Sequence, residues 1–260
     1  MNRIQAANRI LNNEGPQRLL SETANLIVKV ASKNSIVDDI ALQATKELLS
    51  SRKGDENTPS DVIDTIYSFR GVGRYRTIRA LQVRSEFEQL VDTVIEHDPD
   101  TVLEIGTAKG GTLYAWARLL NADTKFISID LPGGEFGGGY SENRQQLLDS
   151  FSDAEMTFIR ANSHSADTIA KAAGEVLHNG VDFLFIDGDH TYEGVKADWT
   201  LYRELVNDGG IVAFHDIAPH PEYPNSNVDQ LWDEIKEDYD TTEFIEDSNQ
   251  GWAGIGLVHL

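Results

Sequence analysis

The stretch VLEIGTAKGGT, residues 102–112, joins an apolar run to three glycines within six positions, with Glu104 two residues before the first glycine. An apolar run followed by glycines and a helical pattern is typical of a strand–loop–helix unit. The dinucleotide fingerprint G-x-G-x-x-G fails because Ala stands at position 108, and no Lys-Ser/Thr pair completes a P-loop. The loop is therefore predicted to hold something other than a phosphate group.

Further apolar strands alternate with helical patterns through the rest of the chain. The strand patterns are KFISID, MTFIRA, VDFLFID, GIVAFHD, TTEFIED and GWAGIGLVHL, and only a few residues separate the last two. Such alternation predicts an α/β fold, a doubly wound parallel sheet that is covered by helices on both faces and ends in an antiparallel hairpin. Ligands of such a sheet bind at the carboxyl ends of its strands.

The amino-terminal third differs from the rest in charge. Residues 1–33 carry five basic and two acidic side chains and show two amphipathic helical faces around Gly15-Pro16. These helices are expected to pack on the main domain or on a second subunit of a homo-oligomer, or to contact a membrane surface peripherally. SSRKGDENTPSD, residues 50–61, is predicted to be a linker, and a helix is predicted from Ile78 to His97. The predicted domains are residues 1–60, a helical extension with its linker, and residues 61–260.

Composition restricts the function and the surroundings of the protein. Its 260 residues include 43 acids and 22 bases, a net charge of −21, which disfavours nucleic-acid binding and favours a halophilic host with a salt-rich cytosol. The chain has no cysteine, so disulfides and thiolate metal sites are excluded. No apolar run approaches a membrane span, so we expect a cytoplasmic protein, with the inner face of the membrane as an alternative.

Acids at two strand ends suggest the ligand. Glu104 would repel a pyrophosphate but attract an ammonium or sulfonium group, and glycines allow a close approach, as S-adenosylmethionine requires. Asp130 ends the second strand, where a carboxylate can accept both ribose hydroxyls. The alternative for both acids is that each caps the next helix. The predicted cofactor-binding residues are Glu104, Gly106, Thr107, Gly110, Asp130, Asn162, Ser163 and Asp187.

The chain resembles the class I S-adenosylmethionine-dependent methyltransferases. The resemblance lies in LEIGTAKGG, FISID, FIDGDHTYEG, GGIVAFHDI and GWAGIG, which occur in the order of the family, and it covers about residues 67–260. It implies a Rossmann-like sheet of seven strands that ends in the reversed hairpin.

Two further strand ends carry candidate catalytic groups. Neighbouring parallel strands lie about 4.8 Å apart, so Asp187 and Asp216 should converge and need a proton, a cation or a metal between them. The position resembles the metal site of catechol-type and macrolide-sugar O-methyltransferases, which implies Mg²⁺ or Mn²⁺ on Asp187, His215 and Asp216. His215 departs from the usual acidic pair of that family. The resemblance also implies that His190 is the general base, acting with Asp187; the alternative is a histidine that only forms hydrogen bonds.

These features predict an S-adenosylmethionine-dependent O-methyltransferase acting on a sugar hydroxyl. FRGVGRYR, IGTAKGGT and IDGDHTYEG look like methyltransferases of surface-glycan assembly, which implies a hexuronic acid or other sugar of a lipid-linked, N-glycan-type glycan in a halophilic archaeon. Arg70, Arg74 and Arg76 could receive the sugar carboxylate or lie in a helix-capping loop. LPGGEFGGGYSENR, residues 131–144, is either a lid or an irregular crossover. The alternatives are a catechol-like or natural-product O-methyltransferase, a nicotinamide-dependent sugar oxidoreductase, and a binding module without activity.

Overall fold

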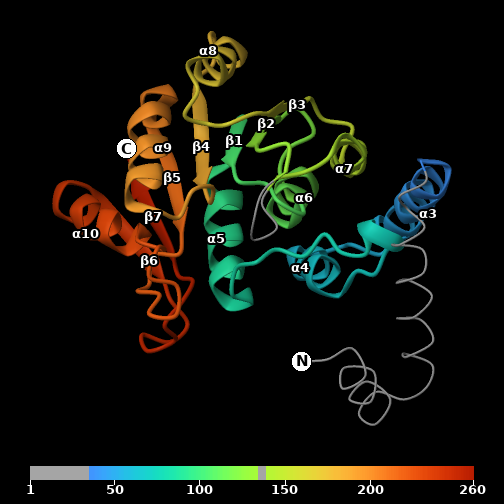
Figure 1. Ribbon diagram of the computed structural model, residues 1–260, viewed down its shortest axis with the longest axis horizontal. Helices are drawn as coiled ribbons and strands as arrows, with labels where there is room; N and C mark the ends of the chain where they lie inside the picture. Colours follow the sequence, from blue (N-terminus) through green and yellow to red (C-terminus); the bar gives the residue numbers. More distant parts are fainter. Residues whose placement is uncertain (1–34, 134–138) are drawn as a thin grey trace.

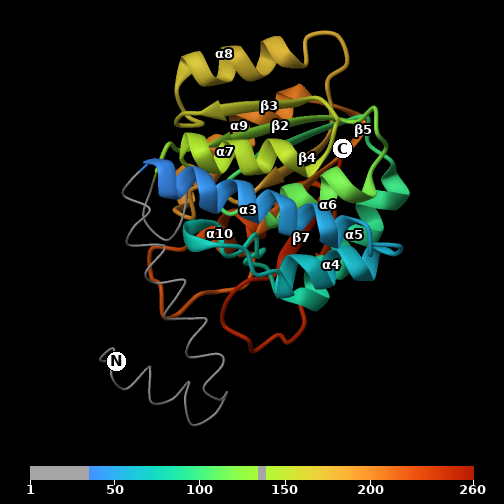
Figure 2. The ribbon, with the colours of Figure 1, turned by 90° about the vertical axis from the view of Figure 1, so that its right-hand side faces the viewer.

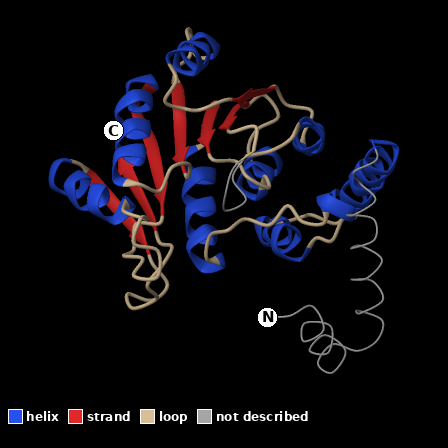
Figure 3. Cartoon of the chain, viewed as in Figure 1, coloured by secondary structure: helices blue, strands red, loops and turns tan. Residues whose placement is uncertain are grey.

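The fold is built around one sheet of seven strands (Figure 3). A computed structural model describes residues 35–133 and 139–260. The strand order is β3-β2-β1-β4-β5-β7-β6; β7 is antiparallel to both of its neighbours and the other pairs are parallel. This arrangement confirms the predicted α/β class and the antiparallel hairpin. The strands are β1 (Thr101–Ile105), β2 (Lys125–Asp130), β3 (Met156–Arg160), β4 (Val181–Ile186), β5 (Val206–His215), β6 (Asp240–Phe244) and β7 (Ile255–His259).

Helices cover both faces of the sheet, which explains why the central strands are apolar throughout. On one face lie α5 (Arg84–His97), α6 (Gly111–Leu119) and α7 (Glu142–Leu148), with α3 (Ser35–Lys53) and α4 (Pro59–Ser68) packed outside them. On the other lie α8 (Ala166–Glu175), α9 (Tyr192–Tyr202) and α10 (Val228–Asp238). Figure 1 shows α9 and α10 to the left of the strands and α6 and α7 to the right. Each layer buries its own hydrophobic cluster against the sheet.

The register of the central strands determines where the site forms. Ile105 of β1 pairs with Ile129 of β2 and Ile186 of β4, and Ile186 pairs in turn with Phe214 of β5. The residues that follow these partners are Gly106, Asp130, Asp187 and His215. Four consecutive positions along one edge of the sheet are thus occupied by the glycine loop and by polar side chains.

The predicted linker is a short turn rather than a long flexible segment. Helix α3 continues to Lys53 and α4 begins at Pro59. Thr58 caps α4, and Asp61 bonds back to the Thr58 backbone in a capping box, a signal that the polar composition of this segment concealed. Glu56 accepts hydrogen bonds from Tyr114 Oη (2.7 Å) and Arg118 Nε (2.9 Å) of α6. The turn is therefore fastened to the main domain, and Figure 2 shows α3 and α4 alongside α7 and α6.

Two other sequence predictions concern the amino-terminal part of the chain. The helix predicted from Ile78 begins only at Arg84, and residues 78–83 form an irregular segment with a bend at Gln82. The predictions made for residues 1–33, two amphipathic helices with membrane or subunit contacts, lie outside the described residues. Within the described part of the chain, every helix is too short or too polar to cross a bilayer.

Candidate active site

Two carboxylates and an imidazole converge just beyond β4 and β5. His190 Nδ1 lies 2.6 Å from Asp216 Oδ2, and His190 Nε2 lies 3.8 Å from Asp187 Oδ1. The backbone carbonyl of His190 accepts a hydrogen bond from the Asn227 amide (2.8 Å), which ties the loop after β4 to the start of α10. The hydrogen bond to Asp216 raises the pKa of His190 above its ordinary value, although burial opposes this effect.

His215 lies beneath the same carboxylates. It is 5% exposed, and its Nδ1 is 3.2 Å from Asp187 Oδ1 and 3.4 Å from Asp216 Oδ1. Burial alone would lower the pKa of His215, but the two carboxylates outweigh it and raise that pKa well above the usual value. Burial would conversely raise the pKa of Asp216, yet His215 and His190 hold it well below its usual range. The centre therefore supplies its own positive charge.

One group of side chains that could hold a metal ion differs from the predicted metal set. One donor atom each of Asp187, His190 and Asp216 lie within 4.8 Å of one another. His215 uses Nδ1 to contact both carboxylates, and its buried Nε2 has no hydrogen-bond partner. Two converging carboxylates with an imidazole fit a divalent cation, and the nitrogen favours manganese or iron over magnesium. The Mg²⁺ or Mn²⁺ site stays a prediction, with His190 as an additional candidate ligand.

Gln82 is part of this centre and was not predicted from sequence. It is 3% exposed, and its Nε2 donates to Asp187 Oδ2 (2.8 Å). Tyr67 Oη fixes the segment by donating to the Gln82 carbonyl (2.9 Å). Because the carboxylate must face the NH₂ group, Gln82 Oε1 points away from it, and this oxygen is buried without a partner. The irregular segment of residues 78–83 brings this glutamine to the site, and the sequence gives no signal of its path.

The strand-end acids of β1 and β2 lie in a different environment. Glu104 is fully buried; Trp116 Nε1 of α6 donates to its Oε2 (3.1 Å), and the side chains of Thr107 and Thr112 also form hydrogen bonds with it. Burial raises the pKa of Glu104 to about 7. Thr107, also buried, shares a hydrogen bond with Ser128 (2.8 Å). A nearby cationic ligand would offset the cost of ionising Glu104.

Asp130 is surrounded by backbone amides. Its Oδ2 accepts from Ala108 N (2.7 Å), and its Oδ1 accepts from Leu131 N (2.7 Å) and Gly139 N (2.9 Å). Burial raises the pKa of Asp130, although these three hydrogen bonds oppose it. Helix α7 is capped by Ser141, so Asp130 orders the loops around the site and does not cap the following helix. Its predicted bonds to ribose hydroxyls would add to these contacts or replace some of them.

The glycines allow backbone segments of the protein itself to approach one another. Gly106 has a φ of +96°, and a Cβ there would lie 1.9 Å from the Asp187 carbonyl oxygen. A Cβ on Gly111 would lie 2.2 Å from Ala80 N. Gly110 caps α6 with a φ of +85°. These close approaches place the glycine loop directly against the backbone of Asp187 and of Ala80.

The residues after β3 line the other end of the same strand edge. Asn162 Oδ1 accepts from His164 N (2.8 Å), and the Ser163 carbonyl accepts from Tyr202 Oη (2.7 Å). His164 Nε2 lies 3.1 Å from Oδ1 of Asp198, and the side chain of Asp198 is fully buried. The hydrogen bond to Asp198 raises the pKa of His164. The predicted contact of Asn162 and Ser163 with adenine stays a prediction.

Two sequence patterns near the site are used for packing. Arg70 donates to the carbonyls of Phe69 (2.8 Å) and Ser68 (3.1 Å) at the end of α4, in line with the helix-capping alternative. Tyr192 and Lys196 have the Tyr-x-x-x-Lys spacing of some nicotinamide-dependent enzymes. Both bond to Glu234 of α10, Tyr192 Oη at 2.6 Å and Lys196 Nζ at 3.0 Å, on the helical layer and away from the strand ends. The pair therefore gives no support to the oxidoreductase alternative.

Parts of this chain are similar in sequence to known proteins, and its fold is similar to that of solved structures. Residues 103–217 match a family described as a methyltransferase domain. The "Uncharacterized protein R132" of Acanthamoeba polyphaga mimivirus is 33% identical over 129 residues, which cover 50% of this chain and 56% of that protein. The chain thus spans little more than half of that relative. The "Rhamnosyl O-methyltransferase" of Mycobacterium tuberculosis is 25% identical over 179 residues, 64% of this chain and 68% of that enzyme.

Among solved structures, the O-methyltransferase from Bacillus cereus in complex with SAH is similar in fold. It aligns with a TM-score of 0.51 and 16% identity, covering 92% of this chain and 99% of that one. At this identity the likeness shows the architecture alone, and it confirms the Rossmann-like arrangement of the seven strands.

Proposed function

We propose that this chain is a class I S-adenosylmethionine-dependent methyltransferase that transfers the methyl group of S-adenosylmethionine to a hydroxyl of a sugar; the match of residues 103–217 to a methyltransferase domain supports this. The observation that carries the proposal is the centre of Asp187, His190 and Asp216 directly beside the glycine loop. A base stands there within reach of an incoming hydroxyl, next to the place where a sulfonium would be attracted.

The donor would lie across the ends of β1, β2 and β3. Glu104 would compensate the sulfonium, Asp130 would receive the ribose hydroxyls, and Asn162 and Ser163 would border the adenine. The burial of Glu104, which raises its pKa, supports this placement, because a cation nearby would relieve an unfavourable buried charge. Gly106, Thr107 and Gly110 would shape the loop beneath the methionine part.

His190 would act as the general base. Its Nδ1–H donates to Asp216, which fixes the tautomer and leaves Nε2 to accept the proton of the acceptor hydroxyl. The hydroxyl oxygen would attack the methyl carbon, and the carbon–sulfur bond would break with its electron pair going to sulfur. The products are a methyl ether, neutral S-adenosylhomocysteine and protonated His190. Asp216 and Asp187 would stabilise that imidazolium.

A divalent cation would fit the same centre. Asp187 and Asp216 would hold it, together with a neutral His190 or His215. Bound there, Mg²⁺ or Mn²⁺ would lower the pKa of the acceptor hydroxyl. If the metal takes His190, the proton must pass to another acceptor, so a chelator experiment bears on the base as well.

The acceptor class rests on a relative and on the sequence. The similarity to a rhamnosyl O-methyltransferase supports a sugar acceptor. We propose a hexuronic acid or other sugar of a lipid-linked or surface glycan, in the cytosol of a halophilic archaeon, to which the charge of −21 is suited. Contact with the membrane face or a second subunit through residues 1–33, and the domain boundary at residue 60, are parts of the same proposal.

Methyl transfer can be tested directly. The protein is incubated with methyl-labelled S-adenosylmethionine and three acceptors, a rhamnoside, a glucuronate-containing oligosaccharide and catechol, with and without EDTA, and the products are identified by mass spectrometry. We expect label on a sugar hydroxyl and loss of activity with EDTA. Label on catechol alone would replace the sugar by a small aromatic acceptor. Unchanged activity in EDTA would remove the metal, and no label on any acceptor would count against the sugar assignment.

A further inference from the structure

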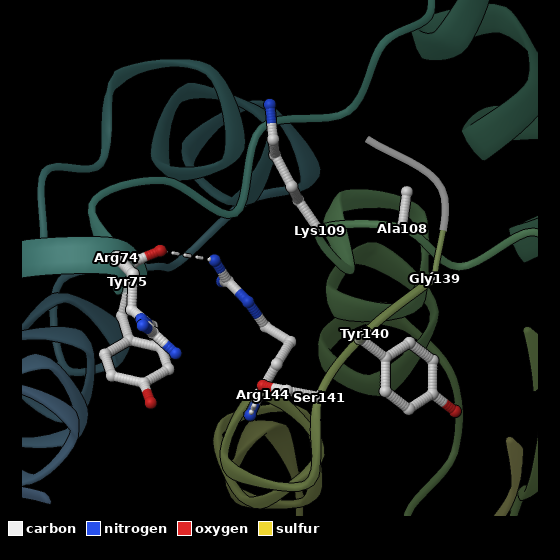
Figure 4. A pocket seen from close by; sticks show the side chains of 8 residues that line it. All are labelled: Arg74, Tyr75, Ala108, Lys109, Gly139, Tyr140, Ser141 and Arg144. Atoms are coloured by element: carbon white, nitrogen blue, oxygen red, sulfur yellow. Dashed lines mark hydrogen bonds between the residues drawn. The ribbon is translucent and has the colours of Figure 1, made fainter. Parts of the chain in front are cut away.

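A cationic cavity lies beside the cofactor loop. Its volume is about 220 Å³, and it opens between the 3₁₀ turn Gly73–Tyr75, the loop after β1 and the start of α7 (Figure 4). Three of its lining side chains are cationic and none is acidic. The lining residues are Arg74, Tyr75, Ala108, Lys109, Gly139, Tyr140, Ser141 and Arg144. In a chain of net charge −21, such a local excess of positive charge indicates a function.

Arg144 is held in a fixed position. Its guanidinium donates to the carbonyls of Thr77 (3.1 Å) and Arg74 (2.9 Å), the second of which is drawn in Figure 4, and lies 5.5 Å from the ring centroid of Tyr75. Burial lowers the pKa of Arg144 to about 10, so the group stays charged at neutral pH. Within residues 35–133 and 139–260, Arg144 forms no ion pair with a carboxylate. Its orientation is thus fixed by neutral groups while its charge is left uncompensated.

Two acids close to the cavity already have partners among the described residues. Asp38 pairs with Arg74 Nε (3.3 Å) and accepts hydrogen bonds from Tyr75 Oη and Asn143 Nδ2. Glu142, next to the cavity along the chain, pairs with Arg160 (3.3 Å). Lys109 forms no hydrogen bond or ion pair within the described residues. Lys109 and Arg144 therefore present two positive charges that have no acidic partner in residues 35–133 and 139–260.

The cavity adjoins the reaction centre through the backbone. Ala108 and Gly139, which line it, both donate their amides to Asp130, the proposed ribose ligand. From Arg74 the chain continues to Gln82, which bonds Asp187. Eight residues span at most about 28 Å even when fully extended, so the Cα atoms of Arg74 and Gln82 are no farther apart than this. One acceptor molecule of a few sugar units could reach both.

We propose that the cavity formed by Arg74, Lys109 and Arg144 binds an oxyanion of the acceptor, a phosphate or a carboxylate, while a hydroxyl of the same molecule reaches His190. The inference rests on the proposed function, because it names the charged part of that function's substrate. A fixed guanidinium and a lysine suit such a group, since charge-assisted hydrogen bonds to oxyanions are the stronger ones. Arg74 thereby takes the anion-binding role considered for it from sequence, and Arg70 does not.

Binding of simple anions tests the inference without methyl transfer. The whole chain, saturated with S-adenosylhomocysteine, is titrated by calorimetry with inorganic pyrophosphate and separately with D-glucuronate. We expect one site for at least one of them, and the anion that binds identifies a phosphate or a carboxylate as the natural group. Lys109→Ala should weaken binding about tenfold or more, and Lys109→Glu should abolish it, since a charge-assisted hydrogen bond is worth about 1.5–3 kcal/mol.

Lys171→Ala, which removes an exposed lysine of α8, is the matched control and should bind like the wild type. Binding of neither anion to the wild type, or equal binding by all variants, would overturn the inference. So would binding that occurs only without S-adenosylhomocysteine, because the cavity would then belong to the cofactor carboxylate. Anion binding by a chain that methylates no sugar would leave the cavity assignment intact and refute only the proposed activity; methyl transfer without anion binding would do the reverse.

Discussion

Two pairs of acids at the same edge of the sheet are treated differently by their surroundings. Glu104 and Asp130, after β1 and β2, receive hydrogen bonds from an indole and from backbone amides, which are neutral donors. Asp187 and Asp216, after β4 and β5, face His190 and His215. Burial raises the pKa of both acids in the first pair, whereas the histidines hold the pKa of Asp216 well below its usual range.

The two acid pairs at this edge of the sheet suit two different tasks, binding of the methyl donor and activation of the acceptor. Burial disfavours a negative charge on both acids of the first pair, so a cationic ligand bound nearby would favour their ionisation. The second pair already has counter-charges and can move a proton between imidazole and carboxylate without a large change in net charge. Binding of the methyl donor and activation of the acceptor would accordingly depend on different residues.

The largest effect on kcat is expected from replacing His190, and it tests whether the two acid pairs act independently. His190→Ala should lower kcat for methyl transfer by roughly 10²- to 10⁴-fold, because the base is lost, while the affinity for S-adenosylmethionine stays within about twofold. Steady-state kinetics and calorimetry measure the two quantities, and His178→Ala, an exposed histidine, is the control. Loss of cofactor affinity in His190→Ala would mean that the two halves are not independent.

Glu104 makes the first half sensitive to pH even without ligand. Its pKa is about 7 in the folded chain and near 4.5 when unfolded, so the folded state retains a proton that the unfolded state loses between these values. The stability of the wild type should therefore fall as pH rises through this window. Relative to the wild type, Glu104→Gln should be equally stable at pH 4.5 and more stable by about 3 kcal/mol at pH 8.

Urea unfolding at several pH values measures this difference. The exposed Glu96→Gln serves as the control and should show no such trend. A stability difference for Glu104→Gln that does not change with pH would show that Glu104 carries no raised pKa. The contrast between the two acid pairs would then disappear.

A smaller effect is expected at Gln82, which belongs to the second half. Gln82→Ala removes the hydrogen bond to Asp187 and should lower kcat about tenfold, the size expected when one hydrogen bond to a charged group is lost. Gln82→Glu, which places a second carboxylate against Asp187, should be worse than Ala. The exposed Gln146→Ala is the control. Normal kinetics for Gln82→Ala would show that the contact between Gln82 and Asp187 contributes to packing alone.

The sequence was sufficient where a local pattern determines structure. Apolar runs predicted the strands, and the rule that parallel strands end at one edge brought Asp187 next to Asp216. The hairpin followed from the short separation of the last two strands. Each of these features depends on few residues that lie close together in the sequence.

What the sequence could not predict depends on the path of irregular segments. Gln82 reaches Asp187 from an irregular segment, residues 78–83, whose apolar residues resemble a helix start. The indole of Trp116 meets Glu104 only once α6 packs on β1. His190 joins Asp187 and Asp216 as a candidate metal-binding group because its Nδ1 lies 2.6 Å from Asp216 Oδ2, a tertiary contact that strand spacing does not contain.

The ratio of S-adenosylmethionine to S-adenosylhomocysteine affinity tests the central claim most directly, because the two ligands differ by the sulfonium charge. Calorimetric titrations at pH 6 and pH 8 should show that preference for the cationic donor rises with pH, by up to about tenfold, as Glu104 ionises with its pKa near 7. In Glu104→Gln the ratio should be the same at both pH values. A wild-type ratio that does not change with pH would contradict the claim that this buried carboxylate attracts the methyl donor.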